Sequence, residues 1–227
     1  MPLPRTIVAD ADWIAAQGKT LWLTPKEQAI FDGWRSETRR SEWLAGRLAA
    51  KRLLQEDLGI APLSWSVGRD GVAPSCDGLL LPYTCLSLSH SGGRGAATLS
   101  DLRVEGSAGI DIQHVRRVHP GLCARVFTPR ERAQIAERFG AEDSTDGMLL
   151  FWALKEAAIK ARRLPWGRAL RTIEVRLVGS DAGRIDLPGE PPLAGRYERR
   201  GGWWLARAIM PPRPNSGEPE KTEWAGG

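Results

Sequence analysis

Residues 151–160 read FWALKEAAIK, and this stretch decides how the C-terminal half of the chain is interpreted. At helical spacing, Lys155, Glu156 and Lys160 share one flank beside a stripe of apolar side chains that would face the core. The helix should end before Pro165, because proline cannot continue a helix. A carboxylate between two lysines suits a metal ligand or a base beside a pyrophosphate. An ordinary helix ion pair between Glu156 and Lys160 explains the same spacing without any function.

A second long helix is predicted in the N-terminal half, from an N-cap at Ser36 to Gly59, which fits the position after the last turn. Two shorter helices are expected where a threonine precedes proline, after Thr24 and after Thr128. Strands are expected at residues 64–67, 86–90, 95–99 and 108–113, and again over 171–209.

Helix and antiparallel-strand material thus occurs in both halves of the chain, which predicts an α+β fold. We expect an N-terminal subdomain over residues 1–106 and a C-terminal subdomain over 107–210. Residues 211–227 contain four prolines and little apolar content, and are expected to form a disordered tail. The two halves are compatible with a duplication, but no internal repeat is strong enough to prove one.

Composition and charge narrow the choice of function. With 42% hydrophobic and 26% charged residues, the chain is a globular protein. It has no apolar run of membrane-spanning length and no secretory signal, so a cytoplasmic protein is expected. Three cysteines without a C-x-x-C pair argue against a disulfide framework or a structural zinc site. The net charge of +5, clustered over residues 35–52, is compatible with an anionic partner, although from charge alone a solvated helix face is the favoured interpretation of the cluster.

Two further segments carry polar groups that chemistry could use. In Gly109-Ile110-Asp111-Ile112-Gln113, strand alternation puts Asp111 and Gln113 on one face, where their oxygens could hold Mg²⁺. In the segment 86–93, His90 lies at a strand end before a double glycine and could donate to a phosphate. A polar outer strand face and a structural histidine are the alternatives that require no function.

Taken in order, these segments resemble the Sfp-type phosphopantetheinyl transferases. The motifs that carry the resemblance are SLSH at 87–90, GIDIQ at 109–113, FTPRE at 127–131 and WALKEAAIK at 152–160, preceded by AGR at 45–47. Each motif alone is weak, but four in this order, over most of the chain, are specific.

The resemblance implies a pseudo-dimer of two similar α+β subdomains, with the active site in the cleft between them. It implies Mg²⁺-dependent transfer of the 4′-phosphopantetheine arm of coenzyme A to a serine of an apo carrier protein, with release of 3′,5′-ADP. The expected partners are coenzyme A and an acidic acyl or peptidyl carrier domain. No nucleic-acid or membrane partner is implied, and the protein should be a monomer.

Site residues follow from the same resemblance. Asp111, Gln113 and Glu156 match metal-binding positions, and Glu156, Lys155 and Asp111 match catalytic ones, with Lys155 a candidate proton donor to the leaving group. Positions that match binding of coenzyme A, either at its pyrophosphate or at its 3′-phosphate, are Arg40, Arg47, Ser89, His90, Lys155 and Lys160.

The sequence departs from the family pattern at two places. Gln113 stands where many relatives have glutamate, which predicts a weaker or differently selective metal site. Residues 71–74 lack a lysine that relatives often carry near the nucleotide. Two other functions stay open: a nucleic-acid-binding module that uses the basic helix and ten tryptophans, and a relative that binds coenzyme A or a carrier without reacting.

Overall fold

The computed structural model describes residues 4–10, 13, 16, 21–66, 84–116, 118–119, 121–165 and 169–212. Its strands are β1 (Arg5–Ala9), β2 (Thr84–Ser91), β3 (Arg94–Asp101), β4 (Ser107–His114), β5 (Glu174–Leu177), β6 (Ala182–Leu187), β7 (Glu190–Arg200) and β8 (Trp203–Met210). Its helices are α2 (Pro25–Gly33), α3 (Glu37–Leu58), the 3-10 helix η2 (Pro62–Ser64), α4 (Leu122–Val126), α5 (Pro129–Phe139), α6 (Thr145–Arg162) and α7 (Ala169–Thr172). Helices packed on antiparallel sheets confirm the predicted α+β class.

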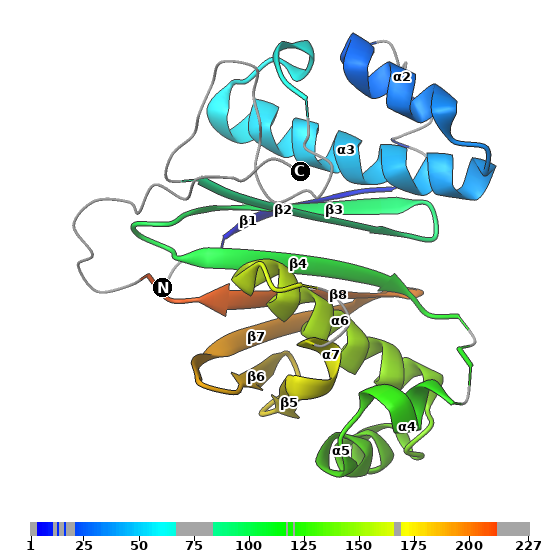
Figure 1. Ribbon diagram of the computed structural model, residues 1–227, viewed down its shortest axis with the longest axis vertical. Helices are drawn as coiled ribbons and strands as arrows, with labels where there is room; N and C mark the ends of the chain where they lie inside the picture. Colours follow the sequence, from blue (N-terminus) through cyan, green and yellow to red (C-terminus); the bar gives the residue numbers. More distant parts are fainter. Residues whose placement is uncertain are drawn as a thin grey trace.

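The strands form two sheets, each with one long helix packed on it. The three-stranded sheet has the order β1-β3-β2 and carries α3, and the five-stranded sheet has the order β4-β8-β7-β6-β5 and carries α6. Figure 1 shows the two sheets next to each other, with α2 and α3 on one side and α6 on the other. Between the sheets, Ile110 and Ile112 of β4 pack with Ala96 and Leu205. The opposite face of β4 is therefore left for α6.

Helix ends agree with the caps predicted from the sequence. Thr24 and Thr128 each begin a helix with a complete capping box, in which a glutamate side chain bonds back to the threonine N–H. Gly59 closes α3 in the left-handed region, with φ 67°.

Local predictions failed where elements are short. The strand expected at 64–67 is wrong over its described residues, 64–66, where Pro62 starts a single 3-10 turn and the Ser64 hydroxyl donates to Ala61 O; residue 67 lies outside the described residues. The short helices α4 and α7 were not predicted, since one turn of helix leaves little periodic signal.

One arrangement occurs twice in the chain. Glu27, from the capping box of α2, forms a buried ion pair with Lys51 of α3 at 2.5 Å. Glu131, from the capping box of α5, forms a buried ion pair with Lys155 of α6 at 2.9 Å. The two glutamates lie 104 residues apart, and so do the two lysines. The sheet orders β1-β3-β2 and β4-β8-β7 correspond in the same way.

Side chains join the two sheets along β2 and β4, which are edge strands running in the same direction. The Ser87 hydroxyl accepts a hydrogen bond from the Ile110 N–H at 3.1 Å. The Ser91 hydroxyl accepts one from the His114 N–H at 3.0 Å. Serine hydroxyls thus take the place of a backbone ladder, and we call this contact the serine seam.

The predicted boundary at residue 106 separates the strands of one sheet from those of the other, and it stays a prediction. Of the expected tail, residues 213–227 lie outside the described residues, as does the segment 71–74. Among the described helices, none is long and apolar enough to cross a membrane.

Candidate active site

Asp111 lies where β2, β4 and α6 meet, and its side chain is fully buried. Its Oδ1 accepts hydrogen bonds from the Ser89 hydroxyl at 2.6 Å and from the Lys160 ammonium at 2.7 Å. Its Oδ2 accepts one from the Gln113 amide at 2.8 Å. Four of the predicted site residues therefore meet at one carboxylate, which Lys160 neutralises.

Glu156 lies beside this group and is only 8% exposed. Its carboxyl is within hydrogen-bonding contact of Asp111 and of the Trp152 side chain. Burial, followed by the negative charge of Asp111, raises the pKa of Glu156 well above its ordinary value, and the charge of Lys160 only partly opposes this. Glu156 therefore holds its proton more firmly than an exposed glutamate does.

A glycine lets α6 approach β4 closely enough to bring these groups together. A Cβ atom on Gly109 would lie 2.0 Å from Ala157 O and 2.5 Å from Ala161 N, both in the α6 backbone. Only glycine permits such an approach of strand and helix. This contact explains how Glu156 and Lys160 reach Asp111, which lies two residues after the glycine.

His90 closes the site on the side of α3. Its ring lies against Gly46, where a Cβ would be 3.3 Å away, and its Nδ1 is 4.0 Å from Glu42 Oε2. Burial lowers the pKa of His90; the charge of Glu42 opposes this, and those of Lys160 and Arg47 add to it. A largely neutral imidazole among these charges is suited to take up a proton when a phosphate arrives.

Arg47 is buried on α3 and stacks on Trp43, with its guanidinium carbon 4.1 Å from the ring centroid. Burial lowers the pKa of Arg47 to about 10, although the charge of Glu27 acts in the opposite direction. Its charge is felt at His90, which places it near the site. Arg40 lies two turns earlier over the Phe31 ring, and within the described part of the chain no hydrogen bond or ion pair joins it to Asp111 or His90.

The structure places Lys155 apart from this group, and its predicted contact with a pyrophosphate stays a prediction. Its side chain is fully enclosed, and its ammonium binds Glu131 at 2.9 Å. It also donates to three backbone carbonyls, those of Val126, Leu170 and Ile173. Lys155 and Glu156 are neighbours on α6 that point in different directions, because each helical residue turns by about 100°. In this structure, therefore, Lys155 does not share the site with Lys160.

The oxygens at the site fit a hard divalent cation. Asp111 and Glu156 supply two carboxylates and Gln113 a side-chain amide, which are the ligand types that Mg²⁺ accepts. Within the described residues, no cluster of three or more His, Cys, Asp or Glu could hold a metal, so the fit depends on the amide as third ligand. A cation held by Asp111 and Glu156 would oppose the two effects that raise the pKa of Glu156, its burial and the charge of Asp111.

Sequence reasoning did not single out two acidic residues that lie against predicted site residues. Glu131 binds Lys155, and Glu42 accepts a hydrogen bond from the Gly92 N–H beside His90. The signal for the first was present, because TPKE at 24–27 and TPRE at 128–131 repeat with the same spacing as the two buried lysines.

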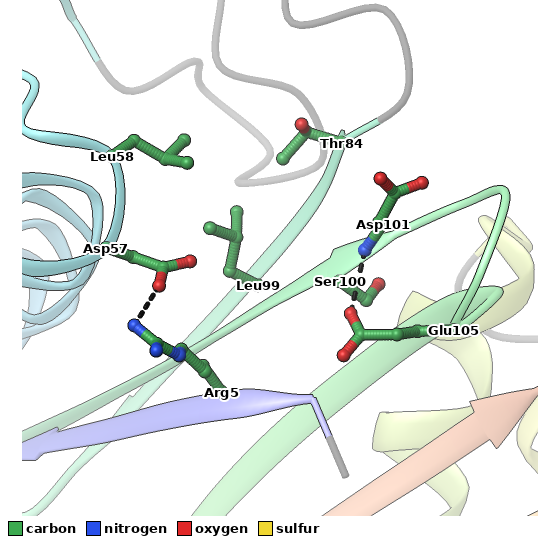
Figure 2. A pocket seen from close by; sticks show the side chains of 8 residues that line it. All are labelled: Arg5, Asp57, Leu58, Thr84, Leu99, Ser100, Asp101 and Glu105. Carbon is green, nitrogen blue, oxygen red and sulfur yellow. Dashed lines mark hydrogen bonds and ion pairs between the residues drawn. The ribbon is translucent and has the colours of Figure 1, made fainter. Parts of the chain in front are cut away.

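A separate pocket lies at the far end of the first sheet (Figure 2). It is lined by Arg5, Asp57, Leu58, Thr84, Leu99, Ser100, Asp101 and Glu105. It includes the first residue of β2, whereas Ser89 and His90 lie near the last. Its carboxylates are already engaged: Asp57 by Arg5, Asp101 by Arg103, and Glu105 by the Asp101 N–H. We therefore assign no ligand to this pocket.

Comparison with protein families gives a match over residues 107–206, to the model described as the 4′-phosphopantetheinyl transferase superfamily. The matched segment contains Asp111, Gln113, Glu156 and Lys160, whereas the site residues from the first sheet and α3 lie outside it. This match confirms the resemblance on which the site residues were predicted.

Among solved structures, the chain is similar to the holo-[acyl-carrier-protein] synthase of Thermotoga maritima. The two have 18% sequence identity and a TM-score of 0.39, over 47% of this chain and 64% of that one. The similarity thus spans less than two thirds of the synthase. The comparison with curated proteins found no match.

Proposed function

We propose that this chain, whose residues 107–206 belong to the 4′-phosphopantetheinyl transferase superfamily, moves the phosphopantetheine arm of coenzyme A onto a serine of an apo carrier protein. The meeting of Asp111, Glu156 and Lys160 inside the family-matched segment is the observation that carries the proposal. Two carboxylates and one ammonium at a buried point are the groups that a reaction at a pyrophosphate requires.

Coenzyme A would bind between the two α+β units, which we infer form a pseudo-dimer. The supporting observations are the repeated ion pairs, the matching sheet orders and the electrostatic interaction of His90, from the first sheet, with Arg47 on one side and with Asp111 and Lys160 on the other. Lys160 would bind the pyrophosphate, and His90 with Arg47 would bind the 3′-phosphate. Asp111, Glu156 and Gln113 would hold a bound Mg²⁺. This ion would neutralise negative charge on the pyrophosphate.

Glu156 is the residue that would take the proton of the carrier serine. Its raised pKa makes it a stronger base, once ionised, than an ordinary glutamate. The serine oxygen would form a bond to the phosphorus that carries the pantetheine arm, and the bond from this phosphorus to the bridging oxygen would break. The products are holo carrier protein and 3′,5′-ADP.

The carrier protein would be acidic, because the chain has a net charge of +5 and carries exposed basic residues at the start of α3 and on α4. Arg35 and Arg39 lie on either side of the start of α3, and Arg125 lies on α4. Opposite charges on the two proteins would guide their encounter. All site residues come from one chain, so we expect the protein to act as a monomer.

Mass spectrometry of apo carrier proteins tests the proposal. A panel of acyl and peptidyl carriers is incubated with the protein, coenzyme A and Mg²⁺, and each carrier is weighed. We expect one carrier serine to gain one phosphopantetheine, and we expect the gain to vanish with EDTA and in Glu156→Ala.

Other outcomes point to the competing functions. Binding of coenzyme A without a mass gain on any carrier would indicate a relative that binds but does not react. Salt-sensitive binding of DNA or RNA that coenzyme A does not affect would instead indicate a nucleic-acid-binding module.

Replacing Gln113 by glutamate should tighten the metal site at a cost to the metal-free protein. A third carboxylate attracts Mg²⁺ more strongly, and we expect the half-saturating Mg²⁺ concentration to fall by about tenfold, which corresponds to ~1.4 kcal/mol. A glutamate at this position cannot donate the hydrogen bond that the Gln113 amide donates to Asp111, and it adds a negative charge beside it. The unfolding temperature in EDTA should therefore fall. Activity measured against Mg²⁺ concentration checks this, and an unchanged Mg²⁺ dependence would contradict it.

A further inference from the structure

The buried ion pair between Lys155 and Glu131 takes no part in the proposed reaction. We propose that the two residues are a positioning pair, which fixes the rotation of α6 and thereby holds Glu156 against Asp111. This inference rests on the proposed function, in which Glu156 is a metal ligand and base.

The contacts of Lys155 tie α6 to four other places in the chain. Its ammonium is 2.9 Å from the Glu131 carboxylate at the start of α5. It donates to backbone carbonyls at the end of α4, in α7 and just before β5, namely Val126 at 3.0 Å, Leu170 at 3.0 Å and Ile173 at 2.8 Å. Both side chains of the pair are 0% exposed. An ammonium held by four acceptors leaves its helix little freedom to turn.

Rotation of α6 matters because Glu156 is the next residue. With about 100° between successive residues, the direction of Lys155 determines which side of the helix presents Glu156. That side lies against β4, where Gly109 admits the α6 backbone. The Lys155–Glu131 pair therefore fixes α6 on one side, and Gly109 allows β4 to pack closely against its other side. A small turn of α6 would separate the two carboxyls.

The N-terminal half contains a corresponding buried ion pair, Lys51–Glu27, which has no carboxylate next to its lysine in the sequence. Lys51 binds Glu27 at 2.5 Å and donates to the carbonyls of Pro62 at 2.7 Å and Trp65 at 3.0 Å. The residue after it is Arg52, which pairs with Glu56 at 2.7 Å. The charges there are the reverse of those at Glu156 and Lys160. Lys51 thus offers a matched control, a buried pair of the same design without a metal ligand beside it.

The experiment compares Lys155→Met with Lys51→Met in the full chain. Each variant removes one buried ammonium at similar volume, so both should lose thermal stability to a similar extent. We expect Lys155→Met to lower Mn²⁺ affinity, measured by electron paramagnetic resonance, and kcat by about 10- to 100-fold. Lys51→Met should keep the Mn²⁺ affinity of the wild type. Equal Mn²⁺ affinities in the two variants would overturn the proposal.

The variant Glu131→Gln tests whether Lys155 positions α6 or instead contacts the substrate directly. It also replaces Lys155→Met in the experiment if that variant does not fold. Glutamine keeps the size of the side chain and one acceptor oxygen for the capping box. A positioning pair predicts that Glu131→Gln also lowers Mn²⁺ affinity and kcat, with little change in the KM for coenzyme A. If Lys155 instead bound the pyrophosphate, removing Glu131 would free it, and activity would be kept or raised. That result would overturn the proposal.

The same measurements distinguish failure of this inference from failure of the proposed function. A wild-type protein that binds Mn²⁺ but modifies no carrier would overturn the activity alone, and the Mn²⁺ affinities of the variants would still decide the role of the pair. A wild-type protein that binds neither Mn²⁺ nor coenzyme A would overturn both.

Discussion

Replacing Glu156 by glutamine should reduce carrier modification by about 10²- to 10³-fold and, at the same time, make the metal-free protein more stable at alkaline pH. Activity falls because the variant loses one of two carboxylates that would hold Mg²⁺ and the group that would accept the serine proton. Stability rises because glutamine cannot ionise. The variant is therefore relieved of a charge that the fold holds in a buried position beside Asp111.

The stability effect has a definite pH dependence. The native pKa of Glu156 is raised above its ordinary value of 4.5, so between these two values the native protein holds a proton that the unfolded chain has released. The contribution of Glu156 to stability is therefore present below pH 4.5 and is lost as the pH rises through the native pKa. Within that window the wild type loses about 1.4 kcal/mol per pH unit relative to the variant.

Thermal unfolding with EDTA and with Mg²⁺, each at pH 5 and pH 8, checks this prediction. In EDTA the advantage of the variant should be larger at pH 8, and Mg²⁺ should stabilise the wild type but not the variant. Glu56→Gln is the control, because Glu56 is an exposed glutamate on the other long helix. The same pH dependence in wild type and Glu156→Gln would contradict the account of the site given above.

Replacing Gly109 by alanine should strongly destabilise the fold. The new methyl group would lie 2.0 Å from a backbone oxygen of α6, and a backbone cannot move aside as a flexible side chain can. We expect a loss of about 3 kcal/mol from the free energy of unfolding. For a chain of this size, that loss lowers the unfolding temperature by roughly 6–12 °C. The displaced helix should also carry Glu156 away from Asp111.

Denaturant unfolding and Mn²⁺ binding measure the two consequences of Gly109→Ala separately. Gly33→Ala, at the end of α2, is the control, since a Cβ there would meet nothing within 4 Å. A folded Gly109→Ala variant with wild-type Mn²⁺ affinity would show that the approach of α6 to β4 does not place the carboxyls.

Local signals predicted the helix ends well, because capping depends on residues a few positions apart. The start of α2 and of α5 is specified locally, by a threonine, a proline and a glutamate within four residues. The end of α3 is likewise specified by Gly59. One-turn elements such as η2 and α4 are decided by tertiary packing, which a short segment of sequence does not record.

The site was predicted in part for the same physical reason. Strand alternation placed Asp111 and Gln113 on one face, and the structure has them hydrogen-bonded there. Helical spacing grouped Lys155 with Glu156 and Lys160, but it could not say which side of α6 would meet β4. Gly109 decides this, and its partner atoms lie some 50 residues away in the sequence. Lys160 consequently forms an ion pair with Asp111 on β4, whereas helical spacing alone suggested a pair with Glu156.

The serine seam has a consequence for any fragment made from one half of the chain. β2 and β4 are each the outermost strand of a sheet, and the unpaired amides of Ile110 and His114 are satisfied by hydroxyls of the other half. Residues 107–210 expressed alone would leave these amides open on a bare strand, which is a template for pairing with another copy. The N-terminal half therefore protects the β4 edge of the C-terminal half from pairing with another copy.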